Sequence, residues 1–440
     1  MEINKNQDNT DFMKETIKKR PLNKRKLMQR TLITAAMAVI FGLVACFTFL
    51  LLEPVISKKL YPEEEPDKVV FVEEMEENEI LPEDMIADDS QMQPEPTEAP
   101  ALEDEQIAQV LSEMELGTED YISLLNSIGE IAWKVRQSIV TVVGVTADVG
   151  WLDNEHESEG AVSGVVVADN GRELLILANT RSINEADSLK VAFADGEEYE
   201  ASVKKKDNNT GLAVLFIPKS KINVDTLEMA KAVTLGTSVG NLTGNPIIAL
   251  GRPVGTEDSL CYGNITSTGN VIRLPDSNYS YMTTDIYGSS IASGILVNLQ
   301  GQIIGIIDMS YNSSDMKNLV SAIGISDLKR LVESLSNGKE IPYFGIYGAD
   351  VTQEANEELG VPFGAYITEI DMDSPAMDAG IQSGDVITKL DETEINDYQD
   401  LVKALLTEET ETELAIELMR QGPDGYTEME LEAVLGLKQE

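Results

Sequence analysis

The spacing of apolar residues divides the chain into four stretches of different character. Residues 31–52 form an uncharged run long enough to span a bilayer as a helix. Residues 62–105 are acidic and dotted with proline, so they cannot bury a core and are expected to form an extended linker. Short β-branched runs then alternate with Gly, Asn and Asp turns up to about residue 335, and a mixed helix and strand pattern follows from residue 341.

Helical spacing of apolar residues precedes the strand-rich stretch. It extends from residue 105 to 135, and Gly117 with Thr118 divides it into two helices. The apolar positions are Ile107, Val110, Leu111, Met114, Tyr121, Leu124, Leu125, Ile128, Ile131 and Ala132. A β-branched strand is expected directly afterwards, at residues 139–145.

Many short strands separated by turns predict an all-β barrel or sandwich. The expected strands are residues 161–168, 173–178, 189–193, 199–204, 212–217, 246–250 and 265–268. Residues 281–308 are interpreted as a polar loop followed by two strands, 295–297 and 303–307, joined by a turn. A Gly/Ser-rich loop presented by a hairpin is well suited to carry a catalytic group. An amphipathic helix at 325–335, stopped by Asn337-Gly338, closes this domain.

The last stretch has its own helix and strand signals. Ser374-Pro375 predicts the start of a short helix that ends before Gly380. Residues 396–406 predict an amphipathic helix with Asn396 as its cap. Alternating residues at 413–420 and 427–434 predict two strands joined by a Gly-Pro-Asp-Gly turn.

Composition and charge exclude several classes of function. At 440 residues the chain has room for about three units of ~150 residues each. The formal net charge of -44 argues against nucleic acid or anionic lipid as a partner for most of the chain. Cys46 and Cys261 lie far apart, so no disulfide is expected. No Cys or His spacing indicates a metal or cofactor site, and His156 is the only histidine.

The apolar run at Thr31–Leu52 is flanked asymmetrically by charge. Eight Lys or Arg residues lie between positions 14 and 30, whereas only Lys58 and Lys59 follow before the acidic linker. This bias places the N-terminus in the cytoplasm and the domains outside. A cleaved signal peptide is an alternative, but the apolar run is longer than its usual 7–15 residues. A second alternative is a lipoprotein, because the residues before Cys46 resemble a lipobox. A lipoprotein would normally turn polar after this cysteine, but the run stays apolar to Leu52, so an uncleaved anchor is favoured. Within the linker, the apolar patch at 69–72 is able to dock on a folded part.

Three motifs together resemble the HtrA (Deg-type) serine proteases. Thr284-Asp285 and the run SIASGIL at 290–296 are similar to that family's nucleophile loop, and aligning Gly294 and Leu296 puts Ala292 at the nucleophile position. The run LANTRSI at 177–183 resembles the strand end that carries the family's histidine, and it puts Arg181 there. Gly211 precedes Leu-Ala-Val-Leu, where the family has its aspartate.

A Ser-His-Asp triad needs a nucleophile, a base and an orienting carboxylate. Arg181 stays protonated and cannot act as the base. His156 lies in an acidic loop expected to be exposed, so it is no substitute. Ser293 would be the fallback nucleophile in a shifted register, but the three motifs offer it neither a histidine nor a lysine. The glycines expected around the oxyanion site are also replaced, by Ser290 and Ser293 among others. These changes predict a catalytically inactive domain.

The C-terminal stretch resembles a PDZ domain of the bacterial protease type. The resemblance rests on YFGI at 343–346 and on SPAMDAGIQSGDVI at 374–387. It implies that the backbone N–H groups of Phe344, Gly345 and Ile346 hold a peptide carboxylate. It also implies that the helix from residue 397 lines the side-chain pocket, through Tyr398, Leu401 and Leu405. The alternative is a PDZ domain used only for contact within the chain.

The strand pattern predicts a mainly β architecture, preceded by one transmembrane helix and a disordered acidic linker. The resemblance implies that it is a trypsin-like double barrel followed by an α+β PDZ domain. The expected division is a cytoplasmic basic tail (1–30), a transmembrane helix (31–52), the linker (53–105), the HtrA-like domain (106–338) and the PDZ domain (341–440).

The predicted function is non-catalytic binding of peptide C-termini or unfolded segments, in quality control or as a scaffold of the cell envelope. An active HtrA-type endopeptidase and a trimer without ligands are the alternatives, and the family resemblance also implies a homotrimer. The lack of disulfides and the lipobox-like Cys46 favour a Gram-positive bacterium.

Overall fold

The computed structural model describes residues 66–71, 117–147, 157–184, 186–423 and 425–437, together with scattered helical positions between 28 and 48. The helix expected at 105–116, most of the acidic linker and His156 lie outside the described residues. The chain forms two units, Met1–Glu65 and Pro66–Glu440. No helix found among the described residues combines the length and the apolar character needed to cross a membrane.

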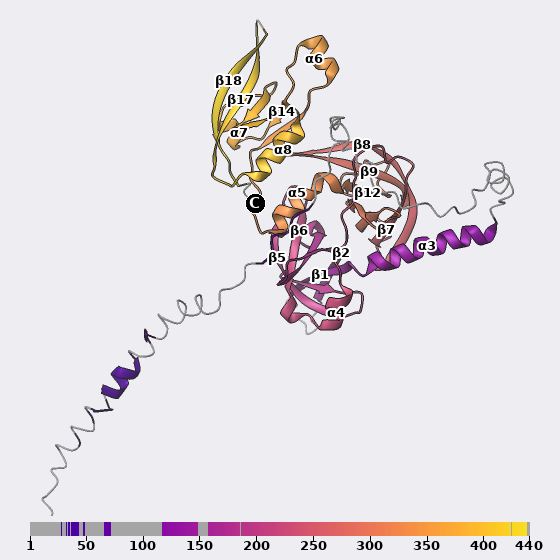
Figure 1. Cartoon of the computed structure of the whole chain (residues 1–440), viewed down its shortest axis with the longest axis vertical. Coiled ribbons are helices and arrows are strands. Elements are labelled where there is room, and N and C mark those ends of the chain that lie inside the picture. Colours follow the sequence, from indigo (N-terminus) through magenta and orange to yellow (C-terminus); the bar gives the residue numbers. More distant parts are fainter. Residues whose placement is uncertain are drawn as a thin grey trace, which may run out of the picture. The chain divides into compact units, whose positions relative to one another are not determined.

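The strand-rich stretch forms two closed six-stranded antiparallel barrels (Figure 1), as predicted. The first has the strand order β1-β2-β3-β6-β5-β4 and the second β10-β11-β12-β9-β8-β7. The strands of the first barrel are β1 (Ile139–Ala147), β2 (Glu157–Asp169), β3 (Glu173–Asn179), β4 (Ser188–Ala192), β5 (Glu198–Lys206) and β6 (Leu212–Pro218). Those of the second are β7 (Pro246–Arg252), β8 (Ser259–Leu274), β9 (Ser277–Tyr287), β10 (Ser293–Val297), β11 (Ile303–Ile307) and β12 (Leu319–Gly324).

A separate antiparallel sheet follows, in the order β13-β14-β15-β17-β18, with β16 paired to β15. Its strands are β13 (Ile346–Asp350), β14 (Ala365–Ile370), β15 (Val386–Leu390), β16 (Thr393–Glu394), β17 (Glu413–Gly422) and β18 (Gly425–Val434). Its helices are α6 (Gln353–Leu359), α7 (Pro375–Asp378) and α8 (Tyr398–Thr407). This sheet has its own buried core, to which α8 contributes Tyr398, Leu401 and Leu405.

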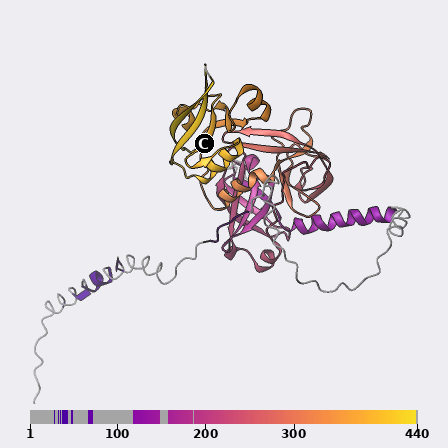
Figure 2. The same cartoon turned by 45° about the horizontal axis from the view of Figure 1, so that its top comes forward.

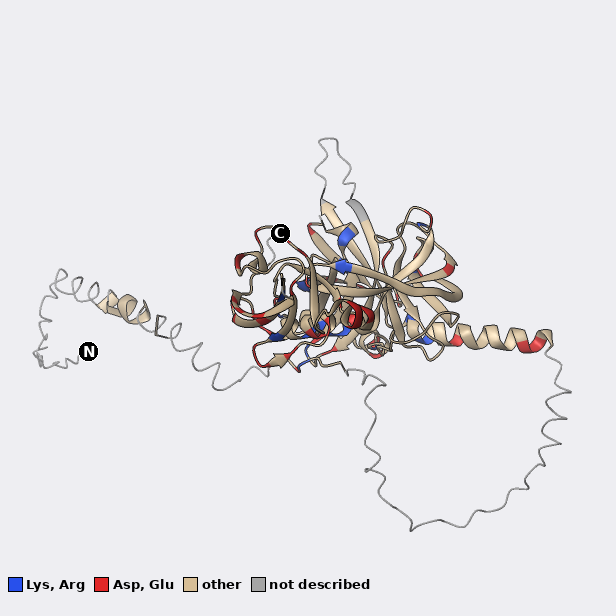
Figure 3. Ribbon diagram, turned by 90° about the horizontal axis from the view of Figure 1, so that it is seen from above, with Lys and Arg blue, Asp and Glu red and all other residues tan. Residues whose placement is uncertain are grey.

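The remaining helices belong to the barrels. They are α3 (Thr118–Arg136), the 3-10 turns η2 (Arg181–Ile183) and η3 (Lys219–Lys221), α4 (Val224–Met229) and α5 (Ile325–Ser336). Acidic residues begin α3 and basic residues end it (Figure 3), an arrangement that complements the helix dipole. Only the C-terminal half of α3 buries side chains, namely Ile128, Ala132 and Val135. In both ribbon views the rest of α3 projects away from the barrels (Figures 1 and 2).

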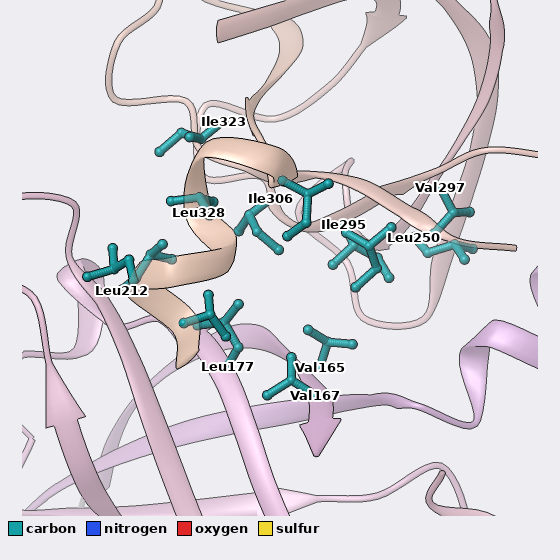
Figure 4. Close-up of a cluster of buried hydrophobic side chains, with 14 of the residues drawn as sticks. Val165, Val167, Leu177, Leu212, Leu250, Ile295, Val297, Ile306, Ile323 and Leu328 are labelled. Carbon is teal, nitrogen blue, oxygen red and sulfur yellow. The ribbon is translucent and has the colours of Figure 1, made fainter. Parts of the chain in front are cut away.

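A single apolar cluster joins the two barrels. Strand residues alternate between this cluster and the interior of their own barrel: Ile176 fills the first barrel, whereas Leu175 and Leu177 face the shared cluster. Leu328 of α5 packs in the same cluster. Figure 4 draws residues from both barrels meeting there, among them Val165, Val167, Leu177, Leu212, Leu250, Ile295, Val297, Ile306 and Ile323.

Residues 62–105 were expected to form an extended linker, with the apolar patch at 69–72 as an exception able to dock. Val69 and Phe71 of this patch bond to the C-terminal end of α5. The Val69 N–H donates to Asn337 Oδ1 at 3.0 Å, and Asn337 Nδ2 donates back to the Val69 carbonyl at 2.8 Å. The Phe71 N–H donates to Glu333 Oε2 at 3.0 Å, and Val69 is only 9% exposed. Residues 66–71 are therefore an ordered part of the domain and not free linker.

Three expectations about local structure were wrong. Residues 281–287 are not a loop but the end of β9, because Thr284 satisfies its hydroxyl inside the sheet by donating to the Val320 carbonyl at 2.7 Å. Strand β8 is far longer than 265–268, and β12, α4 and α6 were not expected. Asp397, not Asn396, caps α8, since its Oδ1 accepts from the Asp400 N–H at 2.7 Å.

Candidate functional site

The loop that resembles a nucleophile loop is a tight turn at residues 288–292, between β9 and β10. The Ser289 N–H donates to the Pro253 carbonyl at 3.0 Å, which holds the turn against β7. A Cβ at Gly288 would lie 2.5 Å from that same carbonyl oxygen, so only glycine fits there. Ala292 is 7% exposed and packs in the core of the second barrel. A methyl group at this buried position offers no nucleophile.

The backbone of this turn is not arranged as an oxyanion site. In trypsin-like enzymes the N–H of the nucleophile residue and that of the residue two before it point at the developing oxyanion. Here the Ala292 N–H donates to the Ser289 carbonyl at 3.0 Å, inside the turn. If Ser293 were the nucleophile, Ile291 would supply the other donor, but its N–H faces Ser289 Oγ at 3.3 Å. Either register therefore has one of its two donors engaged within the turn.

Arg181 and Gly211 lie side by side at one end of the first barrel. Arg181 follows β3 and Gly211 precedes β6, and these strands are paired with Asn179 opposite Leu212. Gly211 has a φ of +76°, and a Cβ there would lie 3.0 Å from Arg181 Nε and 3.2 Å from Arg181 Cβ. The sequence positions expected for a histidine and an aspartate therefore meet in space. Gly211 leaves room for the arginine beside it.

Arg181 links the two barrels. Its Nη2 donates to the Asn209 carbonyl at 3.0 Å in the first barrel and to the Tyr311 hydroxyl at 3.2 Å in the second. The guanidinium carbon lies 5.5 Å from the centre of the Tyr311 ring, within the range of a cation–π contact. Close by, Asn179 Nδ2 donates to Asp308 Oδ2 at 2.9 Å, again from one barrel to the other. Polar bonds thus join the two barrels next to Arg181 and Gly211.

The charge of Arg181 is reinforced by its surroundings. Partial burial acts to lower the pKa of its guanidinium, but the hydrogen bond to Tyr311 and the nearby carboxylate of Asp308 outweigh it. The net effect raises the pKa of Arg181 above its ordinary value. A group that holds its proton this firmly cannot accept one from a serine.

The fallback nucleophile, Ser293, is a structural acceptor. Its Oγ accepts the Ser163 backbone N–H at 3.0 Å, from strand β2 of the other barrel. Ser293 is 7% exposed. Its hydroxyl oxygen therefore takes part in holding β10 against the first barrel.

The PDZ-like domain brings three backbone N–H groups onto one carboxylate. Phe344 N donates to Asp276 Oδ2 at 2.8 Å, Gly345 N reaches both Asp276 oxygens at 2.9 Å, and Ile346 N donates to Oδ1 at 3.0 Å. These are the three groups that the sequence assigned to carboxylate binding. The carboxylate that they hold belongs to the turn between β8 and β9, in the second barrel.

Burial dominates the chemistry of Asp276. It raises the pKa of this carboxyl to about 6, although the N–H bonds from Ile346, Gly345 and Phe344 act to lower it. A cavity of about 20 Å³ adjoins the side chain, and none of its lining residues is Lys or Arg. The backbone N–H groups are thus the partners that compensate this buried charge.

The three helix residues assigned to the peptide pocket are all buried, in different roles. Tyr398 is fully buried, and its hydroxyl donates to the Ile346 carbonyl at 3.1 Å. This bond helps to fix the loop formed by residues 344–346. Leu405 lines the small cavity next to Asp276. Leu401 packs in the PDZ core. Of the three, Leu405 shares the lining of this cavity with Asp276, whereas Tyr398 supports the loop that holds the carboxylate.

Comparison with known proteins agrees with this geometry. The trypsin-like peptidase domain model matches residues 162–306, and the PDZ domain model matches residues 342–431. The serine protease Do-like HtrB of Bacillus subtilis (strain 168) is 28% identical over 282 residues, which cover 59% of this chain and 59% of HtrB. The chain is an HtrA-family protein.

Other members of the HtrA family give the same result. The serine protease Do-like HtrA of Lactococcus lactis subsp. lactis (strain IL1403) is 27% identical over 297 residues, covering 62% of this chain and 70% of that protein. The solved structure titled HtrA-type protease AlgW with decapeptide has a TM-score of 0.52 and 23% identity, covering 71% of this chain and 99% of the AlgW chain. This likeness shows the shared fold. The match to HtrB spans less than two thirds of that relative.

Sequence reasoning missed two groups of this HtrA-family site, Tyr311 and Asp276. Tyr311 contacts Arg181 from 130 residues away, and Asp276 reaches the PDZ loop from 68 residues away. No local pattern links such distant positions. A Pro275-Asp276 pair between two β-rich runs did signal a turn, but its partner became visible only in the fold.

We predict that Gly211→Ala destabilises the protein more than Gly196→Ala does. Both glycines have positive φ, +76° and +88°, so both substitutions carry a similar backbone strain. A Cβ at 196 meets nothing within 4 Å, whereas one at 211 is crowded by Arg181. The difference, on the order of 1 kcal/mol, is measurable by urea unfolding. An equal loss of unfolding free energy in the two variants would show that Arg181 moves away from the new Cβ without destabilising the protein.

Proposed function

We propose that this chain is a membrane-anchored, extracytoplasmic HtrA-family protein whose protease domain is degenerate and whose PDZ domain binds peptides. Its ligands are peptide C-termini or unfolded protein segments, and its role is quality control or scaffolding in the cell envelope. The observation that carries the proposal is the convergence of three N–H groups, from Phe344, Gly345 and Ile346, on one carboxylate.

Such a group of N–H donors is selective for anions. Each N–H gains a charge-assisted bond from a carboxylate, which a neutral amide cannot supply to all three at once. A peptide that ends in this loop extends as a strand beside β13, so that main-chain bonds add affinity. The related AlgW structures are titled as complexes with a decapeptide and with a tripeptide. Those titles support peptide binding as a property that this chain shares.

The degenerate triad is the second part of the proposal. Arg181, Gly211 and Ala292 stand where the base, the orienting carboxylate and the nucleophile are expected. The adjacency of Arg181 and Gly211, and the Ala292 N–H bonded inside its own turn, support this assignment. The alternative is an active endopeptidase, which the names of the relatives favour, since HtrB and HtrA are both called serine proteases.

The anchoring proposal rests on the sequence. The uncharged run at 31–52 and the cationic segment before it support an anchor with the N-terminus inside. The proposed division is a basic tail at 1–30, the anchor, a linker at 53–105, the HtrA-like domain at 106–338 and the PDZ domain at 341–440. A homotrimer is part of the same proposal, and the exposed apolar side chains of α3 support an assembly. They are Tyr121, Ile122, Leu124, Leu125 and Trp133.

We predict that the purified protein does not hydrolyse peptide bonds. A triad knockout in a comparable protease keeps about 10³–10⁴-fold catalysis over water through its oxyanion site and substrate binding. Here one of the two oxyanion donors is also engaged within the turn, so less remains. A fluorophosphonate probe should label no serine, and unfolded casein should stay intact at high protein loading. If the probe labels the unmodified protein but not the Ser293→Ala variant, Ser293 is a nucleophile and the prediction is wrong.

We predict that the full chain binds peptides that end in an apolar residue with a free carboxylate. Amidating that end should abolish most of the binding, because the loop then loses the anion that its N–H groups require. Fluorescence anisotropy with a matched acid and amide pair measures the difference. Equal affinity for the two peptides would refute the carboxylate-loop assignment.

We predict that the folded domains face the outside of the cell. A protease that cuts after glutamate, added to intact cells, should release a fragment by cleavage within residues 62–105, which are rich in Glu. An antibody to the PDZ domain detects the fragment. Release that requires cell lysis would show that the orientation is reversed.

A further inference from the structure

The turn between β8 and β9 lies in the groove where a PDZ ligand would bind. Besides the carboxylate bonds, the Asp276 N–H donates to the Ile346 carbonyl at 2.7 Å. Farther along, Asn278 Nδ2 donates to the Gly348 carbonyl at 3.0 Å, and Gln399 Nε2 of α8 donates to the Asn278 carbonyl at 3.2 Å. The turn is therefore bonded to β13 on one side and to α8 on the other.

These contacts are the ones that a peptide end would make. A terminal carboxylate would accept from Phe344, Gly345 and Ile346, and the N–H of the last residue would pair with a β13 carbonyl. Asp276 supplies both from one residue, because its side-chain carboxylate and its own N–H point into the groove together. The β8–β9 turn thus satisfies the hydrogen-bonding groups of the PDZ loop in the way that a peptide C-terminus would.

The local backbone is set up to present Asp276 in this way. Pro275 and Asp276 are the two residues between the paired ends of β8 and β9, Leu274 and Ser277. Proline suits the first central position of a type II turn, and the second requires positive φ, a position that glycine normally fills. Asp276 has a φ of +61°. Aspartate at this position costs backbone strain that glycine would avoid. In return, its carboxylate accepts hydrogen bonds from the backbone N–H groups of the PDZ loop.

A peptide carboxylate could replace the Asp276 carboxylate in the PDZ loop. The buried carboxylate has only N–H donors and no lysine or arginine along the cavity next to it, so its burial is incompletely compensated. A peptide carboxylate would restore every bond that Asp276 gives up. Exchange of one carboxylate for another therefore leaves the loop with the same set of partners.

We propose that Asp276 is an internal ligand of the PDZ loop, and that a peptide C-terminus binds this protein by displacing the β8–β9 turn. The inference rests on the proposed peptide-binding function and adds its regulation: the groove is closed by the chain itself until a competing carboxylate arrives. The apparent affinity for a peptide is then reduced by the fraction of molecules in which the groove is occupied.

The test compares the parent with Asp276→Asn in the full-length protein. Asparagine tolerates positive φ about as well as aspartate, so the turn is kept. It removes the charge and places an NH₂ donor against the N–H groups of the loop, so the docked state is lost. Asp315→Asn is the matched control, because it removes an exposed carboxylate from another loop of the same barrel.

The ligand is a fluorescent peptide with an apolar last residue, used as free acid and as amide. We expect Asp276→Asn to bind the acid at least about tenfold more tightly than the parent, with Asp315→Asn equal to the parent. Hydrogen exchange gives a second measurement without any ligand. The amides of Phe344, Gly345 and Ile346 should be protected in the parent and should exchange faster in Asp276→Asn.

The outcomes separate the two proposals. If the parent and Asp276→Asn bind the acid equally and both reject the amide, the internal ligand is overturned and the peptide-binding function stands. If neither variant distinguishes acid from amide, the peptide-binding function fails, and the regulation that rests on it falls too. Unchanged exchange at residues 344–346 in Asp276→Asn would also overturn the internal ligand.

Discussion

The apolar cluster shared by the two barrels is the constraint on which the rest of this structure depends. Leu177 and Leu212 from the first barrel pack with Ile295 and Ile306 from the second, and Leu328 of α5 packs with them. Fully burying each such side chain contributes about 1.5–3 kcal/mol. This packing fixes the barrels relative to each other without using any residue of the triad positions. This packing therefore does not depend on the side chains at positions 181, 211 and 292.

Much of the fold was predictable because its signals are local. Short β-branched runs with turns between them predicted an all-β barrel or sandwich, and the resemblance to the HtrA proteases implied two barrels. Helix α5 follows from one helical period with an Asn-Gly stop. The end of β9 was missed because residues 281–287 were interpreted as one polar loop together with the Gly/Ser-rich turn that follows them. Arg181, Gly211 and Ala292 were singled out from motifs, whereas Tyr311 and Asp276 could not be. Their roles arise from pairing between segments that only the fold brings together.

The two candidate sites differ in what they require of the sequence. A triad depends on three particular side chains, so one substitution at each position removes its chemistry. The PDZ loop depends on backbone N–H groups, which any residue except proline supplies. Its requirement is one of shape: Gly345 has a φ of +86°, and a Cβ there would lie 2.4 Å from Ser374 Cβ. A carboxylate site of this kind is therefore less sensitive to side-chain substitution than a triad is.

Arg181 has a structural role between the barrels. Arg181 bonds to Asn209 in its own barrel and to Tyr311 in the other, and its guanidinium lies over the Tyr311 ring. A side chain at 211 would crowd this arginine, since a Cβ there would lie 3.0 Å from Arg181 Nε and 3.2 Å from Arg181 Cβ. Residues 181 and 211 are thus coupled: glycine makes room, and arginine uses that room to join the barrels. Because the two residues are in contact, the effects of substituting them are not expected to add, and replacing Arg181 would remove its polar bonds between the barrels.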